Sequence, residues 1–194
     1  MTVASTPVEE YLGQLGSTSA VPGGGSAAAL AGAMGVALLG MVAALSARKG
    51  ADPAERERLS ALAPELEQLR GRLLQLSQDD IDAYRAVLDA RKRKAPPEVL
   101  NRASARAAEV PLETARACDR ALSIFSDVSP TAWEVTRSDL NAGGALLAVG
   151  LRAALANVAV NLPDLDGATR TGLEAAYRAL QAKHPGPADP SGEH

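Results

Sequence analysis

Aromatic residues, histidine and cysteine are all scarce in this chain of 194 residues. Aromatic side chains make up 3% of it, and both histidines, His184 and His194, lie close to the C-terminus. We therefore expect no metal site built on histidine, and no serine or cysteine nucleophile activated by histidine, in the core. Cys118 has no second cysteine with which to form a disulfide. It is interpreted as a small core residue.

A large basic surface and the common nucleotide-binding motifs are also missing. The formal net charge is -3, and the chain has no Walker A sequence, no dinucleotide fingerprint and no zinc-ligand spacing. Because few aromatic side chains are present to stack on bases, we expect no nucleic-acid partner. Any chemistry then depends on carboxylates, hydroxyls and amides. Such groups suit acid–base catalysis with water as the nucleophile.

Charged residues are missing from a long stretch near the N-terminus. None occurs between Tyr11 and Ala47, and the run from Ala27 to Leu45 contains only Ala, Gly, Leu, Met and Val. The run is long enough to cross a bilayer, but Ala and Gly gain little from hydrocarbon. We interpret it as the buried helix of a protein with no membrane partner, with a membrane span as the alternative. No Lys or Arg precedes it, so we expect no signal peptide and a cytoplasmic location.

The composition predicts an all-α fold. Hydrophobic residues make up 46% of the chain, and Ala, Leu and Val dominate them, which favours close helix packing. Two Ala/Gly-rich helices are expected, from about Ser26 to Arg48 and from Ser138 onwards. They are natural partners at the centre of a multihelical antiparallel bundle, or across a two-fold interface. We predict a single domain over residues 1–184 and a flexible tail over 185–194.

Capping residues and prolines place the remaining helices. A capping box is predicted at Thr6–Glu9 and another at Asp52–Glu55, and Pro64 is expected to kink or restart the helix after the second box. Later helices are expected over Pro97–Phe125, with a kink at Pro111, and over Ala168–Lys183. Leucines spaced alternately by three and four residues predict one buried seam: Leu59, Leu62, Leu66, Leu69, Leu73 and Leu76.

A glycine-rich turn, Pro22–Ser26, precedes the first Ala/Gly-rich helix. Three consecutive glycines let the backbone turn tightly and present unobstructed amides, and Ser26 is expected to cap a helix that Ala27 begins. The residues leave two interpretations open. The turn is either a cradle for an anion or another ligand, or only a loop that leads into a buried helix.

An acidic residue lies where the leucine seam would continue. The spacing after Leu76 reaches Asp80, and a buried carboxylate must be paired, protonated or functional. Either the seam ends at Asp79–Asp82, or Asp80 is paired with an arginine or belongs to a site. Near the end of the second Ala/Gly-rich helix, Asn157 and Asn161 are one turn apart and can share a polar face.

Several segments together resemble the cyclodeaminase/cyclohydrolase family, in the same order and over residues 7 to about 166. They are Tyr11–Leu12, Pro22–Gly32, Asp80–Tyr84, Val110–Leu112, Ser138–Leu140 and Asn157–Leu162. The family contains the cyclodeaminase half of formiminotransferase-cyclodeaminase and stand-alone methenyltetrahydrofolate cyclohydrolases. The resemblance implies a helical bundle that dimerises. It also implies an enzyme that closes 5-formiminotetrahydrofolate with loss of ammonia, or that adds water to 5,10-methenyltetrahydrofolate.

The resemblance also implies roles for individual residues. Asp139 becomes the acid–base or cation-stabilising carboxylate, with Asp80 and Asp82 as weaker candidates. Because Asp139 is expected at a helix N-terminus, which favours the ionised form, water activation or cation stabilisation suits it best. The folate is expected to contact Pro22, Gly23, Gly24, Gly25, Ser26, Ser138, Asn157 and Asn161. The folate derivative is the substrate, and no further cofactor and no metal are expected.

One segment departs from the family pattern. Relatives tend to carry a Gly- and Asn-rich stretch before the Ser-Asp pair, whereas this chain has Ala132–Arg137. Trp133 can stack on a pterin or simply pack in the loop. The leading hypothesis is a homodimeric methenyltetrahydrofolate cyclohydrolase, preferred because no formiminotransferase domain is attached. Formiminotetrahydrofolate cyclodeaminase is the second, and a non-catalytic folate-binding or helical interaction protein is the third.

Overall fold

The computed structural model describes residues 2–49 and 51–185, and every regular element in that part of the chain is helical. The α-helices are α1 (Val8–Leu15), α2 (Gly24–Lys49), α3 (Pro53–Ala61), α4 (Ala63–Lys92), α5 (Pro97–Val128), α6 (Arg137–Asn161) and α7 (Gly167–Lys183). Short 3-10 turns lie at Val3–Ser5, Ser129–Thr131, Glu134–Thr136 and Leu162–Asp164. The predicted all-α class is confirmed. The predicted tail begins at Pro185, and its residues 186–194 lie outside the described residues.

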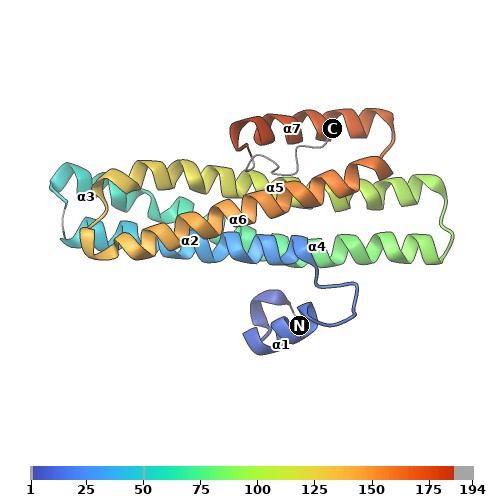
Figure 1. Ribbon diagram of the computed structural model, residues 1–194, viewed down its shortest axis with the longest axis horizontal. Coiled ribbons are helices and arrows are strands. Elements are labelled where there is room, and N and C mark those ends of the chain that lie inside the picture. Colours follow the sequence, from blue (N-terminus) through green and yellow to red (C-terminus); the bar gives the residue numbers. More distant parts are fainter. Residues whose placement is uncertain (1, 50, 186–194) are drawn as a thin grey trace, which may run out of the picture.

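Four long helices form the bundle (Figure 1). α2 packs between α6 and α4, and α5 packs between the same two helices on the other side. α7 lies along α5, whereas α1 projects from the opposite side of the molecule. α2 begins beside the middle of α4, so beyond Gly24 the bundle continues with α4, α5 and α6 alone (Figure 1). The N-terminus of α2 is thus aimed along the inside of the bundle.

Small residues let α2 and α6 approach closely at the centre. A Cβ added to Gly35 would lie 2.8 Å from the carbonyl oxygen of Gly143, and one added to Gly150 would lie 2.9 Å from that of Ala28. Neither glycine can therefore become alanine unless the two backbones separate. This contact confirms the two Ala/Gly-rich helices as the central pair.

The core is built from the predicted leucine seam and these small residues. Leu59, Leu66, Leu73 and Leu76 are buried, whereas Leu62 and Leu69 pack at its edge. Pro64 lies in the first turn of α4 after a break at Leu62, so the restart predicted there is confirmed. α5 runs through Pro111 to Val128 as one helix, three residues beyond the predicted end at Phe125.

Three of the predicted caps are wrong. α1 begins at Val8 after Pro7, and the Thr6 hydroxyl donates backwards to the carbonyl of Thr2 instead of capping α1. α2 begins at Gly24, two residues before Ser26, and the Ser26 hydroxyl bonds to Tyr11 and Ser77 instead of capping the helix. α6 begins at Arg137, so Ser138 lies within its first turn and is exposed.

Only the Asp52 half of the capping box predicted for α3 is confirmed. The carboxylate of Asp52 accepts a hydrogen bond of 2.9 Å from the amide of Glu55, and Pro53 is the first helical residue. The Glu55 side chain pairs with Arg58.

Two segments are long and apolar enough to cross a membrane by length and composition, Gly24–Lys49 and Glu134–Asp164. They contain α2 and α6, the central pair of the bundle, and 50% and 39% of their most apolar windows are buried inside the molecule. A central position in a bundle itself requires apolar sequence on the buried side. The interpretation of residues 27–45 as a core helix is therefore consistent with the packing of α2.

Candidate functional site

A cavity of about 210 Å³ lies where α2 begins, between α4, α5 and α6. Its polar lining comes from residues far apart in the sequence: Gly23, Gly24, Gly25, Asp80, Asn157 and Asn161. Six of the sequence-predicted site residues therefore meet at one place. The volume is below the usual range for a whole drug-sized ligand, so the cavity accommodates one ring system of a larger molecule.

The first turn of α2 faces this cavity. Amides at the start of a helix have no partner within the helix, and the helix dipole adds a positive partial charge there. At the start of α2 these are the amides of Gly24, Gly25 and Ser26, of which only the first two belong to residues that line the cavity. The arrangement favours an oxygen that carries partial or full negative charge beside Gly24 and Gly25.

Asp80 brings the carboxylate of the site. Its side chain is half-buried, and this partial burial raises the pKa of Asp80 to about 6, against the lowering effect of a hydrogen bond from the Ser26 amide. A Cβ added to Gly25 would lie 2.0 Å from the Asp80 carboxylate, so only glycine leaves room for it. Asp80 is thus held against the N-terminus of α2 and can bind or release a proton near neutral pH.

Ser26 has a structural role in this geometry. Its hydroxyl is fully buried and lies 3.0 Å from the Tyr11 hydroxyl and 2.8 Å from that of Ser77. The Ser77 hydroxyl also donates to the Ser26 carbonyl. The side chain of Ser26 therefore ties α1 and α4 to the start of α2, and only its amide reaches the site, through Asp80.

Two asparagines, Asn157 and Asn161, line the cavity. The Asn157 amide nitrogen donates to the carbonyl of Ala153, and that of Asn161 donates to the carbonyls of Asn157 and Ala107. With both nitrogens engaged, the side-chain oxygens have no donor among the residues that the structure describes, and each can accept a hydrogen bond from a ligand. Asn161 also joins α6 to α5, so both predicted roles, ligand contact and helix tie, fit it.

The other predicted residues lie elsewhere. Asp82 is on the outer side of α4, where its carboxylate accepts from Gln78 and lies 3.7 Å from Arg85. Pro22 is buried beside the cavity but does not line it. Ser138 and Asp139 are in the first turn of α6, and at 1.5 Å per residue Asp139 is about 27 Å along the helix from Asn157. Within one chain, Asp139 is separated from the cavity.

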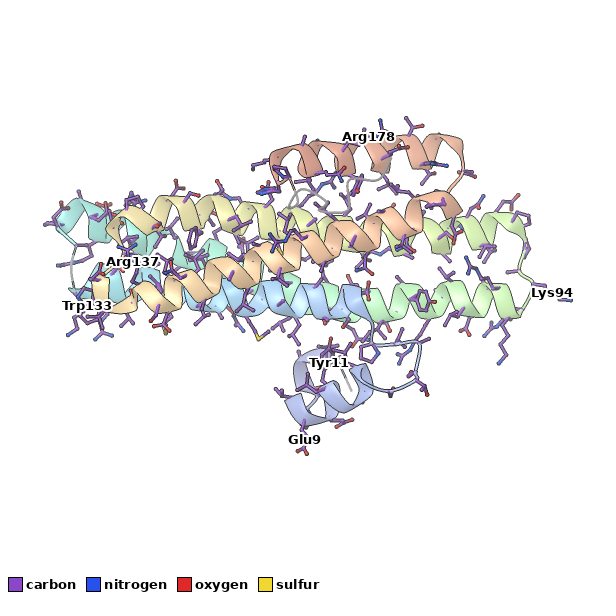
Figure 2. The ribbon with its side chains drawn as sticks, viewed as in Figure 1. Glu9, Tyr11, Lys94, Trp133, Arg137 and Arg178 are labelled. Atoms are coloured by element: carbon purple, nitrogen blue, oxygen red, sulfur yellow. The ribbon has the colours of Figure 1, made fainter. Side chains whose placement is uncertain are left out.

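The segment that departs from the family pattern is at the same distant end. Trp133 and Arg137 lie at one end of the bundle and Lys94 at the other (Figure 2). The Trp133 amide donates to the Ser46 hydroxyl at 2.8 Å, which joins this segment to the C-terminal half of α2. The residues 132–137 therefore do not line the cavity of their own chain.

Tyr84 also lines the cavity and is missing from the predicted site residues. It follows Asp80 by four residues on α4, and residues four apart share a helix face. The spacing from Asp80 to Tyr84 was therefore a usable signal. The wall is completed by four further residues that nothing in their sequence context marked: Ala20, Val21, Ala107 and Val160.

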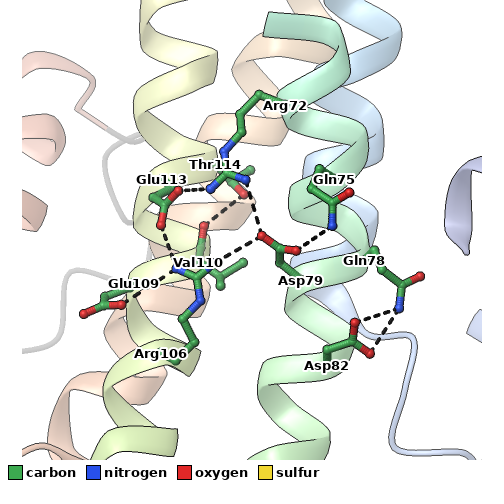
Figure 3. Close-up of polar contacts among 10 residues, drawn as sticks. All are labelled: Arg72, Gln75, Gln78, Asp79, Asp82, Arg106, Glu109, Val110, Glu113 and Thr114. Carbon is green, nitrogen blue, oxygen red and sulfur yellow. Dashed lines mark hydrogen bonds and ion pairs between the residues drawn. The ribbon is translucent and has the colours of Figure 1, made fainter. Parts of the chain in front are cut away.

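An ion-pair network on the outside holds α4 and α5 together beside the site (Figure 3). Asp79 pairs with Arg72 at 3.4 Å and with Arg106 at 3.1 Å, and both arginines also pair with Glu113. Burial alone would raise the pKa of Glu113, but the hydrogen bonds from the two arginines lower it. Asp79 and Asp80 are consecutive, yet one faces this network and the other faces the cavity.

Within residues 2–49 and 51–185, no group of three or more His, Cys, Asp or Glu side chains is arranged to hold a metal ion. Asp80 is also the only ionisable carboxylate among the residues that line the cavity. The chemistry available there is proton transfer by one carboxylate, with backbone amides and carboxamide oxygens to orient a ligand.

Comparison with known proteins places this geometry in a family. The chain is 34% identical over 169 residues to a methenyltetrahydrofolate cyclohydrolase of Methylorubrum extorquens, which covers 82% of this chain and 80% of that protein. It is 29% identical to a formimidoyltransferase-cyclodeaminase of Sus scrofa, again over 82% of this chain but over only 31% of that longer protein.

A solved structure has the same fold. The formiminotetrahydrofolate cyclodeaminase from Thermotoga maritima superposes with a TM-score of 0.87 over 94% of this chain and 91% of that one, at 22% identity. The family model described as formiminotransferase-cyclodeaminase matches residues 7–178. With the model matching most of its length, the chain belongs to the formiminotransferase-cyclodeaminase family.

Proposed function

We propose that this protein is a folate one-carbon enzyme that hydrolyses 5,10-methenyltetrahydrofolate to 10-formyltetrahydrofolate, with Asp80 as the acid–base group. The observation that carries the proposal is the cavity at the start of α2, where one carboxylate with a pKa of about 6 meets free helix amides and two asparagine oxygens. Similarity to a methenyltetrahydrofolate cyclohydrolase supports this choice of reaction.

The proposed reaction begins with addition of water to the methenyl carbon. That carbon joins N5 and N10 and carries positive charge, which a nearby ionised Asp80 stabilises. Asp80 accepts one proton as the water oxygen bonds to the carbon. The product of this step is a neutral hydroxyl adduct, and the proton rests on Asp80.

The second step opens the ring. The bond between the carbon and N5 breaks, Asp80 returns its proton to N5, and the hydroxyl proton leaves to solvent as the formyl C=O forms on N10. One water is consumed and one proton is released, which balances the loss of the positive charge. Partial negative charge on the reacting oxygen is stabilised by the amides of Gly24 and Gly25.

The asparagines bind the substrate in this proposal. The pterin edge carries N–H donors, and the free oxygens of Asn157 and Asn161 are acceptors on the cavity wall. Tyr84, 40% exposed at the rim, provides an aromatic surface beside the bound ring. The remainder of the folate extends out of the cavity. No cofactor other than the folate is part of the proposal.

We also propose a cytoplasmic homodimer. The outer side of α2 is apolar and uncharged from Ala27 to Leu45, and Met34 and Met41 are 48% and 40% exposed on it. Val149 and Val160 of the adjacent α6 are exposed as well. An exposed apolar surface of this length is typical of a face that another protein covers. The α2 face is therefore the surface through which two copies are proposed to associate.

The test follows the near-ultraviolet absorbance of 5,10-methenyltetrahydrofolate against its uncatalysed hydrolysis. The wild-type protein is expected to accelerate the decay, and Asp80→Asn to lower kcat by about 100-fold to 10,000-fold, the usual contribution of a general acid–base group. Asp89→Asn, which changes an exposed carboxylate on the same helix, is the matched control and is expected to keep wild-type activity. Equal activity in wild type and Asp80→Asn would refute the role of Asp80.

Formiminotetrahydrofolate cyclodeaminase activity, a lyase reaction that releases ammonia, is the second candidate. It is favoured by similarity to the formimidoyltransferase-cyclodeaminases of Sus scrofa and Mus musculus. Ammonium release from 5-formiminotetrahydrofolate, measured on the same preparations, decides between the two. Turnover of this substrate without acceleration of methenyl hydrolysis would replace the first proposal. Turnover of neither would support a non-catalytic folate-binding protein.

A further inference from the structure

We propose that helix α1 of one copy docks into an apolar groove on a second copy, formed by the C-terminal half of α2, by α3 and by the start of α4. The inference deepens the proposed homodimer by naming the segment that one copy extends to the other. Its test measures cross-linking and requires no folate, so its failure and the failure of the proposed enzyme activity are distinguishable.

The groove has the size and chemistry to accept a helix face. Its volume is about 550 Å³, and it is lined mainly by small or aliphatic side chains: Gly40, Ala43, Ala44, Ala47, Leu59 and Leu66. A smaller cavity of about 250 Å³ continues it along Val36 and Ala37. Because alanine and glycine dominate the α2 wall, another helix can approach this wall closely. Two arginines, Arg48 and Arg56, lie at one end of the groove.

Helix α1 has an apolar side that its own chain leaves uncovered. Tyr11 is buried and anchors the helix through its hydroxyl bond to Ser26, and it points towards the bundle in Figure 2. The next side chains on the same side, Val8 and Leu12, are 75% and 57% exposed. An isolated helix of eight residues is not stable in water by itself. Its apolar side is therefore a surface that a second contact would stabilise.

The charges of the two surfaces are complementary. Glu9 and Glu10 are exposed on α1, and Glu9 points away from the bundle (Figure 2). Within the described parts of the chain, neither glutamate forms an ion pair, and no acidic side chain pairs with Arg48 or Arg56. Acidic α1 and the basic end of the groove thus present opposite, unpaired charges at the margins of two apolar surfaces.

A two-fold axis gives these surfaces the correct positions. α1 lies on the α2–α4 side of the bundle near Ser26, and the groove lies on the same side near the other end of α2. The axis runs just outside α2 near the midpoint of the helix, perpendicular to the helix and parallel to its outer face. Rotation about this axis makes the two α2 helices antiparallel. It keeps the α4 side of each copy on the same side of the pair. The α1 of each copy is thereby carried over the groove of the other.

Neither the described C-terminus nor α7 of the same chain lies near enough to cover the groove. The described C-terminus, Pro185, lines a cavity with Leu122 and Arg152 on the α5–α6 side, away from α3 and the start of α4. α7 packs on α5. A second copy is therefore the occupant that the charges and the position of α1 favour.

The experiment mixes two single variants, Leu12→Cys and Ala44→Cys, that carry tags of different mass, and oxidises them. The native thiol does not interfere, because Cys118 is fully buried and burial raises the pKa of its thiol to about 12. A disulfide-linked product that contains both tags is expected on a non-reducing gel. Each variant oxidised alone is expected to give several-fold less linked dimer than the mixture.

Gly13→Cys mixed with Ala44→Cys is the matched control. Gly13 follows Leu12 but lies on another side of α1, and a Cβ added there meets nothing within 4 Å. At least fivefold less linked product than with Leu12→Cys is expected. Equal linking from Leu12→Cys and Gly13→Cys would overturn the proposal. So would a double variant with Leu12→Cys and Ala44→Cys in the same chain that forms only a disulfide within that chain. A protein that stays monomeric at every concentration would overturn it as well.

A charge exchange tests the orientation independently of any thiol. Glu9→Lys is expected to raise the dimer dissociation constant by roughly threefold to fivefold, the usual size for one exposed pair, and Arg48→Glu to do the same. The double variant is expected to recover most of the wild-type affinity. Sedimentation at two salt concentrations measures this, because the loss should shrink at high salt. Additive losses in the double variant would contradict docking of α1 at the arginine end.

Discussion

The two ends of α6 differ in what surrounds them. At its C-terminal end, Asn157 and Asn161 line a cavity together with the N-terminus of α2 and the half-buried Asp80. At its N-terminal end, Ser138 is exposed and Asp139 is half-buried in the first turn of the helix. Both ends carry segments through which the sequence resembles the family, but only one brings three other helices around its polar residues. A helix terminus becomes a site when other elements enclose it.

The largest difference expected between the two ends of α6 is in catalysis. Asp80→Asn is expected to lower kcat by about 100-fold or more, whereas Asp139→Asn is expected to stay within about threefold of wild type, because Asp139 is remote from the cavity of its own chain. Steady-state hydrolysis of 5,10-methenyltetrahydrofolate measures both. An equal loss in the two variants would mean that Asp139 from a second copy completes the site.

The arrangement of helices was largely predictable from the sequence. The all-α class, the central Ala/Gly-rich pair and the restart at Pro64 follow from apolar spacing and from proline chemistry. The ends of helices were harder to predict. The hydroxyls of Thr6 and Ser26 could cap a helix, but Thr6 bonds to the carbonyl of Thr2 four residues earlier, and Ser26 bonds to Tyr11 and Ser77. The presence of a capping residue type does not by itself reveal which of these competing partners it takes.

The site was predictable in part. The glycine turn and the two asparagines stood out by their spacing, the family resemblance added a role in folate binding, and Asp80 stood out because it interrupts an apolar seam. The sequence alone did not show whether Asp80 or Asp139 is the better candidate for the acid–base carboxylate. The environment decides which carboxylate lines a cavity at a helix N-terminus, and in the structure four helices far apart in the sequence create that environment.

The second prediction concerns stability and pH. Burial raises the pKa of Asp80 from 3.8 to about 6, so the folded protein favours its neutral form. The contribution of this neutral carboxyl to the free energy of unfolding is complete below pH 3.8 and is lost as the pH rises through 6. At pH above 7 the ionised side chain costs up to about 3 kcal/mol. Asp80→Asn is therefore expected to raise the free energy of unfolding by up to about that amount near pH 7.5.

Urea unfolding of wild type and Asp80→Asn at several pH values measures the difference. The gap is expected to shrink as the pH falls through 6 and nearly to vanish near pH 4, because the wild-type carboxyl is then neutral. Carboxylates such as Glu113, whose lowered pKa gives the opposite pH dependence, are common to both proteins and cancel in the difference. A gap independent of pH would show that Asp80 is not held in this environment.

The third prediction tests the enclosure of Asp80 by backbone. Gly25→Ala would place a methyl group 2.0 Å from the Asp80 carboxylate, which must then move away from the Ser26 amide. We expect kcat to fall by roughly 10-fold to 100-fold, since small displacements of a catalytic group are costly. Gly71→Ala is the control, because a Cβ there meets nothing within 4 Å. Wild-type kinetics in Gly25→Ala would contradict the tight contact.

The smallest expected effect compares asparagines at the two ends of α6. Asn157→Ala removes a hydrogen-bond acceptor from the cavity wall, whereas Asn141→Ala removes an exposed side chain near the start of the helix. Asn157 is preferred to Asn161 for this test, because its amide nitrogen bonds only within α6 while that of Asn161 also joins α5. One hydrogen bond of about 1 kcal/mol, made equally in substrate and transition state, predicts a KM raised roughly fivefold with kcat unchanged. Asn141→Ala is expected to leave both constants unchanged. A fall in kcat for Asn157→Ala would instead mean that its oxygen acts on the reacting centre, and the polar wall would then share the chemistry that we assign to Asp80.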